Sequence, residues 1–250
     1  MAPAIWVLWL QAPEIAAAVE PGQFVMVETG DGYDPLLKRA FSVFRVTGED
    51  SAAPERLGLL YTPSGRGSSR TARRRPGETI EIIGPLGRGY DVPPQAHNLL
   101  MVAGGVGIAP IVFLAERAIA KGRSVTILQG GASAQQLFPS QELPAEVELV
   151  TATLDGSAGR RGLVTDLVPE YLDWADQVFA CGPMAMYRTL AGQLPRLPSR
   201  KHCQVLLETP MACGFGLCYT CAVETRRGIK LVCKDGPCFD LREIDWDALP

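Results

Sequence analysis

Five of the seven cysteines fall between residues 213 and 238, and their spacing is typical of a metal site. Cys213, Cys218 and Cys221 are spaced C-x4-C-x2-C, and Cys233 follows after a longer interval. With this spacing a tight loop and one distant thiolate bind the two irons of a [2Fe–2S] cluster. Glycines at 214 and 216 suit the loop, because glycine lets backbone N–H groups approach the sulfurs. The sequence therefore predicts an iron–sulfur site.

Two alternatives stay open for the cysteines. A four-cysteine zinc site usually shows two short C-x2–4-C pairs, whereas this stretch has a single pair with x2 spacing. Cys238 is a second candidate for the fourth ligand. We favour Cys233 because it ends the apolar run KLVC, which we expect to be a strand. Cys203 precedes the loop and is expected to be a buried core thiol.

Two glycine-containing turns predict a dinucleotide site. Each follows an apolar strand pattern and precedes a helical one. Glycine lets the backbone approach a phosphate, and a helix N-terminus offers free N–H groups. Turns at the carboxyl ends of parallel strands form the crevice where such sheets bind ligands. The alternative is a pair of tight turns without a ligand. The predicted residues are Gly104, Gly105, Gly107 and Pro110 in the first turn, and Cys181, Gly182, Pro183 and Met184 in the second.

Two further motifs lie in the first third of the chain. The run Arg39-Ala40-Phe41-Ser42 offers a cation, an aromatic ring and a hydroxyl on an expected strand. The loop at residues 64–69 contains Gly67 and Ser68, and such loops bind phosphate through backbone N–H groups and hydroxyls. Taken alone, an Arg and a Ser on a strand are usually a surface pair, and the loop fits a solvated surface equally well.

The elements that must position these motifs change along the chain. Short apolar runs separated by Pro/Gly turns up to residue 95 predict a small antiparallel β-barrel. Strands then alternate with helices, which predicts a parallel-sheet α/β domain. We therefore expect a barrel at residues 1–95, an α/β domain at 96–200 and a small cysteine module at 201–250.

Composition limits the partners and the compartment. A net charge of -3 gives no general attraction to nucleic acid or to an anionic membrane. The apolar N-terminal stretch lacks a basic leader and is too short to span a bilayer. We therefore expect a protein of the reducing cytoplasm, where clustered cysteines bind metal more often than they form disulfides.

The motifs together resemble a known family. RAFS (39–42), GRGSS (65–69), GPLG (84–87), AGGVGIAP (103–110) and CGPM (181–184) follow the order of the ferredoxin–NADP reductase superfamily. The more specific MACGFGLCYTC (211–221) with VCKDGP (232–237) resembles the electron transfer subunit of bacterial NAD-dependent dihydroorotate dehydrogenase. DPLLKRAFSV (34–43) is close to the flavin segment of that family.

The resemblance implies three cofactor sites. Arg39 would contact the FAD phosphates and Ser42 would lie near the isoalloxazine ring. The two glycine turns would hold NADH against the flavin, and Cys238 falls where the family has an aliphatic residue, which favours Cys233 as a ligand. The full implied FAD set is Arg39, Ala40, Phe41, Ser42, Leu60, Tyr61, Thr62, Gly67 and Ser68. The implied cluster ligands are Cys213, Cys218, Cys221 and Cys233.

The same resemblance implies an NAD-linked oxidoreductase subunit. It would pass electrons through FAD and the [2Fe–2S] cluster between NAD and an FMN-containing subunit that oxidises dihydroorotate in pyrimidine biosynthesis, in a heterotetramer. No catalytic residue for dihydroorotate is evident, and both histidines are expected at the surface. NAD is favoured over NADP because residues 130–138 carry no basic side chain. The alternatives are an NAD(P)H-dependent reductase of ferredoxin or another carrier, and a redox sensor without enzyme activity.

Overall fold

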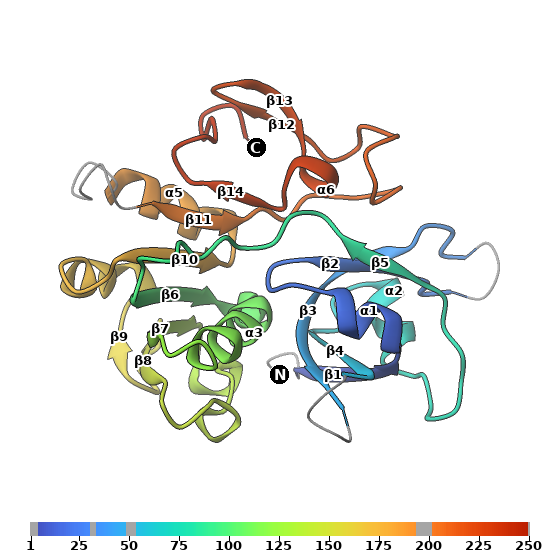
Figure 1. Ribbon diagram of the computed structural model, residues 1–250, viewed down its shortest axis with the longest axis horizontal. Coiled ribbons are helices and arrows are strands. Elements are labelled where there is room, and N and C mark those ends of the chain that lie inside the picture. The colour runs from blue at the N-terminus through green and yellow to red at the C-terminus, as the bar shows by residue number, and fades with distance from the viewer. Residues whose placement is uncertain (1–4, 31–33, 49–53, 194–201, 250) are drawn as a thin grey trace.

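Two β-sheets and a small hairpin make up the molecule (Figure 1). The structure, a computed structural model, describes residues 5–30, 34–48, 54–193 and 202–249. The first sheet is built from the N-terminal part of the chain and the second from the rest. Among the described helices, none is both long enough and apolar enough to cross a membrane.

The N-terminal sheet confirms the predicted antiparallel barrel. Its strands curl around one another in Figure 1, in the order β1-β4-β3-β2-β5, with all neighbours antiparallel. The register places Ser42 opposite Phe24 and Arg39 opposite Val27. The elements are β1 (Trp6–Gln11), α1 (Pro13–Ala18), β2 (Phe24–Val27), β3 (Arg39–Thr47), β4 (Arg56–Tyr61), α2 (Arg66–Thr71) and β5 (Ile82–Leu86).

The larger sheet confirms the predicted α/β fold. Its order is β14-β11-β10-β6-β7-β8-β9, and all pairs are parallel except β11 with β14. The strands are β6 (Asn98–Gly104), β7 (Ser124–Gly131), β8 (Glu148–Thr153), β9 (Arg160–Arg161), β10 (Gln177–Cys181), β11 (Cys203–Leu206) and β14 (Cys238–Asp240). The helices are α3 (Ile108–Ile119), α4 (Val168–Tyr171) and α5 (Met184–Gln193), with 3-10 turns η1 (Gly105–Gly107), η2 (Ala134–Gln136), η3 (Ser140–Glu142) and η4 (Val164–Asp166).

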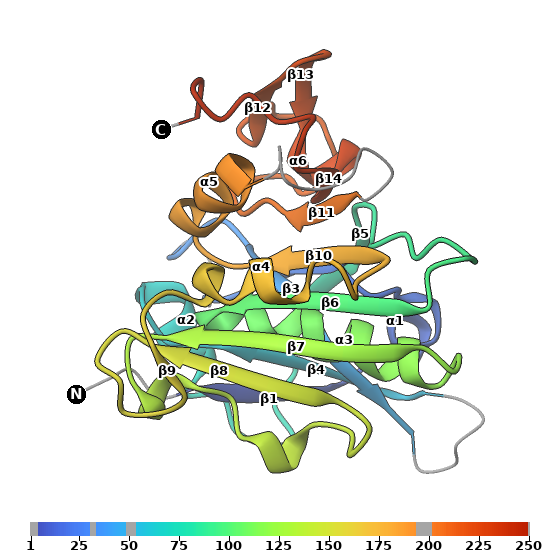
Figure 2. The same ribbon diagram turned by 90° about the vertical axis from the view of Figure 1, so that its left-hand side faces the viewer.

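Helix α3 joins the barrel to the larger sheet. It lies behind the sheet in Figure 2 and contacts β3 of the barrel. Its buried side chains share one core with Phe44 and Leu60 of the barrel and with Met101 of β6. This apolar contact holds the barrel against the carboxyl ends of the parallel strands, where ligands bind in such sheets.

The C-terminal segment contains a hairpin and contributes to the larger sheet. Strands β12 (Ala222–Thr225) and β13 (Gly228–Leu231) pair antiparallel, and the one-turn helix α6 (Val232–Asp235) follows. Cys233 lies in α6, so the expectation that it lies on a strand is wrong. Strands β11 and β14 extend the larger sheet beyond residue 201. The three-domain division, with its boundary at that residue, stays a prediction.

Candidate functional site

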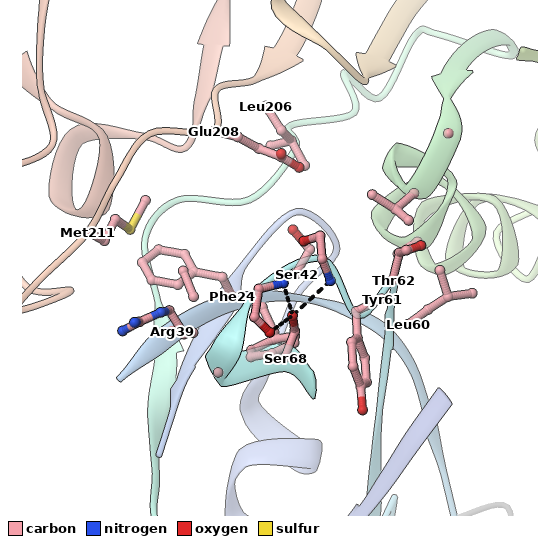
Figure 3. A pocket seen from close by; sticks show the side chains of 18 of the residues that line it. Phe24, Arg39, Ser42, Leu60, Tyr61, Thr62, Ser68, Leu206, Glu208 and Met211 are labelled. Carbon is pink, nitrogen blue, oxygen red and sulfur yellow. Dashed lines mark hydrogen bonds between the residues drawn. The ribbon is translucent and has the colours of Figure 1, made fainter. Parts of the chain in front are cut away.

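A cavity of about 710 Å³ lies between the barrel and the larger sheet (Figure 3). Strand β3 and the end of β4 form its barrel side, and the loop that begins α2 closes it. The chain after β11 lies opposite. The lining includes every residue of the implied FAD set: Arg39, Ala40, Phe41, Ser42, Leu60, Tyr61, Thr62, Gly67 and Ser68.

One end of this cavity can bind phosphate. Arg39 and Arg66 line it, and guanidinium groups form strong hydrogen bonds with phosphate oxygens. The Ser68 Oγ accepts hydrogen bonds of 3.1 Å from the backbone N–H groups of Ser64 and Gly65, as Figure 3 shows. A Cβ at Gly67 would lie 2.8 Å from the Thr29 Oγ1, so only glycine fits there. The two guanidinium groups suit the phosphates of a flavin dinucleotide, and the apolar side chains of the cavity suit its ring.

A second cavity, of about 480 Å³, opens at the carboxyl ends of β6, β7 and β10. Gly104, Gly105, Gly107, Gly182 and Pro183 line it, as the sequence predicted. The other three predicted dinucleotide residues line neither cavity: Pro110 and Cys181 are buried, and Met184 packs against the core. A dinucleotide here would contact the backbone of the glycine turns.

The two glycine turns are in direct contact. A Cβ at Gly104 would lie 2.7 Å from Pro183 Cδ, and one at Gly107 would overlap the carbonyl group of Cys181. The N–H of Gly182 donates to the Tyr187 hydroxyl at 2.9 Å, and that hydroxyl donates to the Leu206 carbonyl at 2.6 Å. Glycine is therefore required for the close approach, and Tyr187 ties the second turn to β11.

Glu208 is a site residue that the sequence interpretation missed. Among the described residues that line the two cavities it is the only carboxylate, and it lines both. It faces the flavin cavity from the side opposite Ser42 in Figure 3. The residue is exposed to the cavities, but the protein around it reduces the solvation of its carboxylate, and this raises its pKa. An acidic residue directly after the apolar strand QVLL is the signal that could have found it.

The four predicted ligands lie in two pairs. The Cys218 thiol lies close enough to Cys213 to influence its pKa, and the Cys221 thiol lies close enough to Cys233 to do the same. The backbone N–H of Cys233 also donates to the Cys221 sulfur at 3.4 Å. Within the described ranges no three His, Cys, Asp or Glu side chains gather in a geometry that holds one metal ion. Two thiolates per iron is the arrangement that a [2Fe–2S] cluster needs.

The cysteine loop supplies N–H donors to sulfur. Burial raises the pKa of Cys213, but N–H groups of Phe215, Cys218 and Leu217 outweigh it and hold that pKa at about 6. The N–H of Leu217 lies 3.4 Å from the Cys213 sulfur. Gly214 and Gly216 have φ values of 84° and 90°, which only glycine adopts without strain. The loop is therefore shaped to stabilise thiolates, as the sequence suggested.

The cysteine pairs are connected to the flavin cavity. Phe24 lines the cavity and belongs to the same buried core as Cys221 and Cys233. Met211 lines the cavity two residues before Cys213. Cys238 lies elsewhere, where its thiol donates to the Gln204 side chain at 3.2 Å. The structure thus brings Cys233 to the other three cysteines, next to the flavin cavity, and leaves Cys238 apart.

The fold and the cavities define a flavin- and dinucleotide-dependent oxidoreductase with an iron–sulfur module. Residues 101–191 match the model of the oxidoreductase NAD-binding domain, and residues 208–245 match the iron–sulfur cluster binding domain of dihydroorotate dehydrogenase B. The chain is 33% identical over 247 residues to the "Dihydroorotate dehydrogenase B (NAD(+)), electron transfer subunit" of Bacillus cereus strain Q1, covering 96% of this chain and 92% of the relative. The chain belongs to this family of electron transfer subunits.

Solved structures agree with this membership. A chain of the NADH-dependent reduced ferredoxin-NADP oxidoreductase, described for flavin-based electron bifurcation, matches with a TM-score of 0.85 and 27% identity. That match covers 98% of this chain and 87% of the other. The ferredoxin reductase of carbazole 1,9a-dioxygenase shares the fold, with a TM-score of 0.66 and 21% identity over 80% of this chain and 64% of its own. The protein is an oxidoreductase subunit that uses FAD, NAD and a [2Fe–2S] cluster. The iron–sulfur cluster replaces zinc as the group bound by the cysteines.

Proposed function

We propose that this chain passes electrons between NAD and an FMN-containing partner subunit that oxidises dihydroorotate, in a heterotetramer of two such chains and two catalytic subunits. The observation that carries the proposal is the shared core of Phe24, which lines the flavin cavity, with Cys221 and Cys233. When bound, FAD exchanges a hydride with NAD(H) and single electrons with the cluster. The chain's own residues place these groups next to one another.

In the proposed arrangement each dinucleotide has a cavity of its own. FAD occupies the 710 Å³ cavity, with Arg39 at its phosphates and Ser42 near its ring. NAD(H) occupies the 480 Å³ cavity, with its phosphates at the glycine turns. Gly105, Val106, Gln136 and Glu208 line both cavities, so the nicotinamide and the flavin ring meet beside these residues.

Each pair of cysteines binds one of the two irons of the cluster. Cys213 and Cys218 bind one iron, and Cys221 and Cys233 bind the other. The second pair is buried in the core that also contains Phe24, whereas Cys218 is exposed on the loop. One side of the cluster therefore faces the flavin cavity and the other faces the surface.

The surface beside Cys218 is apolar, which supports docking of the partner subunit there. Phe215, Leu217 and Tyr219 flank the cysteine and are 49%, 74% and 66% exposed. Large exposed apolar side chains grouped on one loop mark interaction sites. A partner on this loop would cover Cys218 and bring its own flavin close to the cluster. None of the seven cysteines, all within the described residues, forms a disulfide, and a reducing compartment such as the cytoplasm keeps cysteines available as cluster ligands.

Substitution of Cys218 tests the order of carriers. Cys218→Ser is expected to abolish NAD reduction driven by dihydroorotate in the reconstituted complex. It is expected to leave NADH oxidation by an artificial acceptor that takes electrons at the flavin within about twofold of the parent protein. Cys238→Ser is the matched control and should keep both activities. Loss of both activities in a folded, FAD-loaded Cys218→Ser protein would contradict the proposed order.

A second candidate is a reductase of ferredoxin or another electron carrier. The match to a chain of the ferredoxin-NADP oxidoreductase, at 27% identity over 98% of this chain, favours it. The two functions differ in the partner and share the cavities. NADH-dependent reduction of ferredoxin by this chain alone, with no activity toward a dihydroorotate-oxidising subunit, would establish the second function.

A further inference from the structure

The motif VCKDGP at residues 232–237 contains a lysine directly after the proposed ligand Cys233. The acidic residue of the motif is used locally, because the Asp235 carboxylate accepts a 2.8 Å hydrogen bond from the Leu231 N–H at the end of β13. Lys234 is exposed. Within the described ranges no acidic side chain forms an ion pair with it. Its charge is therefore available to act on the groups beside it.

The stem of Lys234 lies against the cysteine loop. A Cβ at Gly216 would lie 2.7 Å from the Lys234 Cδ, 3.2 Å from its Cβ and 3.4 Å from its Cγ. Gly216 lies in the loop two residues before Cys218. Because the glycine has no side chain, it leaves room for the stem. Lys234 thus joins helix α6, which carries Cys233, to the loop that carries Cys213 and Cys218.

Gly216 also acts on the sulfur of Cys233. Burial and the neighbouring Cys221 thiol raise the pKa of the Cys233 thiol to about 12, whereas the Gly216 N–H group lowers it as a hydrogen-bond donor. Hydrogen bonds to the sulfurs, net charge and exposure to solvent set the reduction potential of an iron–sulfur cluster. The stem of Lys234 therefore covers a backbone group that acts directly on a proposed ligand.

The positive charge of Lys234 favours the reduced state of a cluster bound here. Four thiolates make a [2Fe–2S] cluster anionic, and its reduction adds one more negative charge. A cation close to the cluster stabilises the more negative state and so raises the reduction potential. Water and salt weaken this attraction at an exposed loop, so the effect is moderate and depends on ionic strength.

We propose that Lys234 is a positioning residue of the iron–sulfur site: its stem fixes the cysteine loop against α6, and its ammonium group raises the reduction potential of the cluster. The inference rests on the ligation by Cys233 proposed above. Lys234 thereby helps to set the potential at which single electrons enter and leave the cluster, on the side of the flavin and on the side of the partner.

Redox titration of the full chain, loaded with FAD and cluster and followed by electron paramagnetic resonance, tests the role of the charge without a partner present. Lys234→Met keeps most of the stem and removes the ammonium group. Its equilibrium constant for cluster reduction is expected to fall about threefold or more, which is about 28 mV for a one-electron couple. High salt should narrow the difference between this variant and the parent protein. Lys234→Arg keeps the charge and should keep the parent potential.

Lys234→Ala tests the role of the stem. This variant removes the charge as Lys234→Met does, and it also uncovers Gly216. We expect the same fall in potential and, in addition, a several-fold faster release of iron to a chelator than from Lys234→Met, because water reaches the loop. Equal rates of iron release from the two variants would overturn the role of the stem.

A matched control separates the local effect from the net charge of the chain. Lys121→Met removes the same charge from an exposed position just after α3 and should leave the potential and the iron release unchanged. The proposal would be overturned by a parent potential in a Lys234→Met protein with normal iron and sulfide, or by an equal shift in Lys121→Met. Either result would leave the ligands and the electron path intact. A parent protein without iron and sulfide after reconstitution would instead overturn the proposed function together with the role of Lys234.

Discussion

The side chain of Met26 fills the space that a side chain at Gly214 would need. A Cβ at Gly214 would lie 2.5 Å from the Met26 Cγ and 3.2 Å from the Leu86 Cδ1. Met26 and Leu86 belong to the barrel strands β2 and β5, and Gly214 belongs to the cysteine loop. The loop therefore packs directly on the barrel, so the cysteines and the flavin cavity are held at a constant separation.

Gly214→Ala should separate the loop from the barrel. The new methyl group meets Met26, and the φ of 84° is unfavourable for alanine, so we expect a loss of about 2 kcal/mol or more in unfolding free energy. Cluster content per chain should fall as well. Gly192→Ala in α5 is the control, because a Cβ there would meet no neighbouring atom within 4 Å, and it should be neutral or slightly stabilising. Urea unfolding and iron analysis provide the measurements. Equal stability of the two variants would contradict the packing.

The fourth cluster ligand is tested by two serine substitutions. Cys233→Ser should remove the [2Fe–2S] absorption and most of the iron, because this thiol pairs with Cys221. Cys238→Ser should keep both, since that thiol is hydrogen-bonded to Gln204 instead. The iron and sulfide content of protein purified without oxygen provides the measurement. The reverse result would assign Cys238 as the ligand.

A charge on the cysteine loop should weaken docking of the partner. Leu217→Arg puts a cation in the exposed apolar surface beside Cys218, and we expect the affinity for the catalytic subunit to fall at least tenfold. Ile229→Arg serves as the control, since Ile229 is 66% exposed but lies on the β13 hairpin. Cluster content should be normal in both variants. An equal loss of affinity in both would place the interface elsewhere.

Glu208 should make the stability of the protein depend on pH. Enclosure raises its pKa in the folded state above the unfolded value. The folded chain then binds more protons than the unfolded chain between the two pKa values, so stability falls as the pH rises through the folded value. Glu208→Gln removes this loss. We expect the variant to gain stability relative to the parent protein as the pH rises above about 4, the ordinary range of a Glu carboxyl, measured by urea unfolding. A relative loss with rising pH would show that the folded state favours the carboxylate.

Local patterns predicted most of the fold because each motif depends on a few adjacent residues. The alternation of short strands and Pro/Gly turns predicted the barrel, and both glycine turns lie where strands meet helices. The exposure of His97 and His202 was also expected, and both lie at the surface. The helical turn that carries Cys233 was missed, because KLVCKD has the apolar run of a strand and only the tertiary packing ends β13 at Leu231.

Contacts between distant segments could not be predicted from the sequence. Glu208 reaches both cavities because β11 lies beside β10 in the sheet. Cys233 was favoured over Cys238 by an expected strand, which the structure does not contain, and by a resemblance; the structure places its thiol near that of Cys221. The acidic residue after the apolar strand QVLL is visible in the sequence, but only the tertiary fold shows that Glu208 lines both cavities.

The central claim is that electrons pass between NAD(H), FAD and a [2Fe–2S] cluster held by this single chain. The most direct test is the visible absorption spectrum of protein purified without oxygen, recorded before and after addition of NADH. We predict flavin bands on a broad iron–sulfur background, with both bleached by NADH. A protein that binds FAD but contains no iron or sulfide after reconstitution, or whose cluster absorption stays unchanged while the flavin is reduced, would contradict the account.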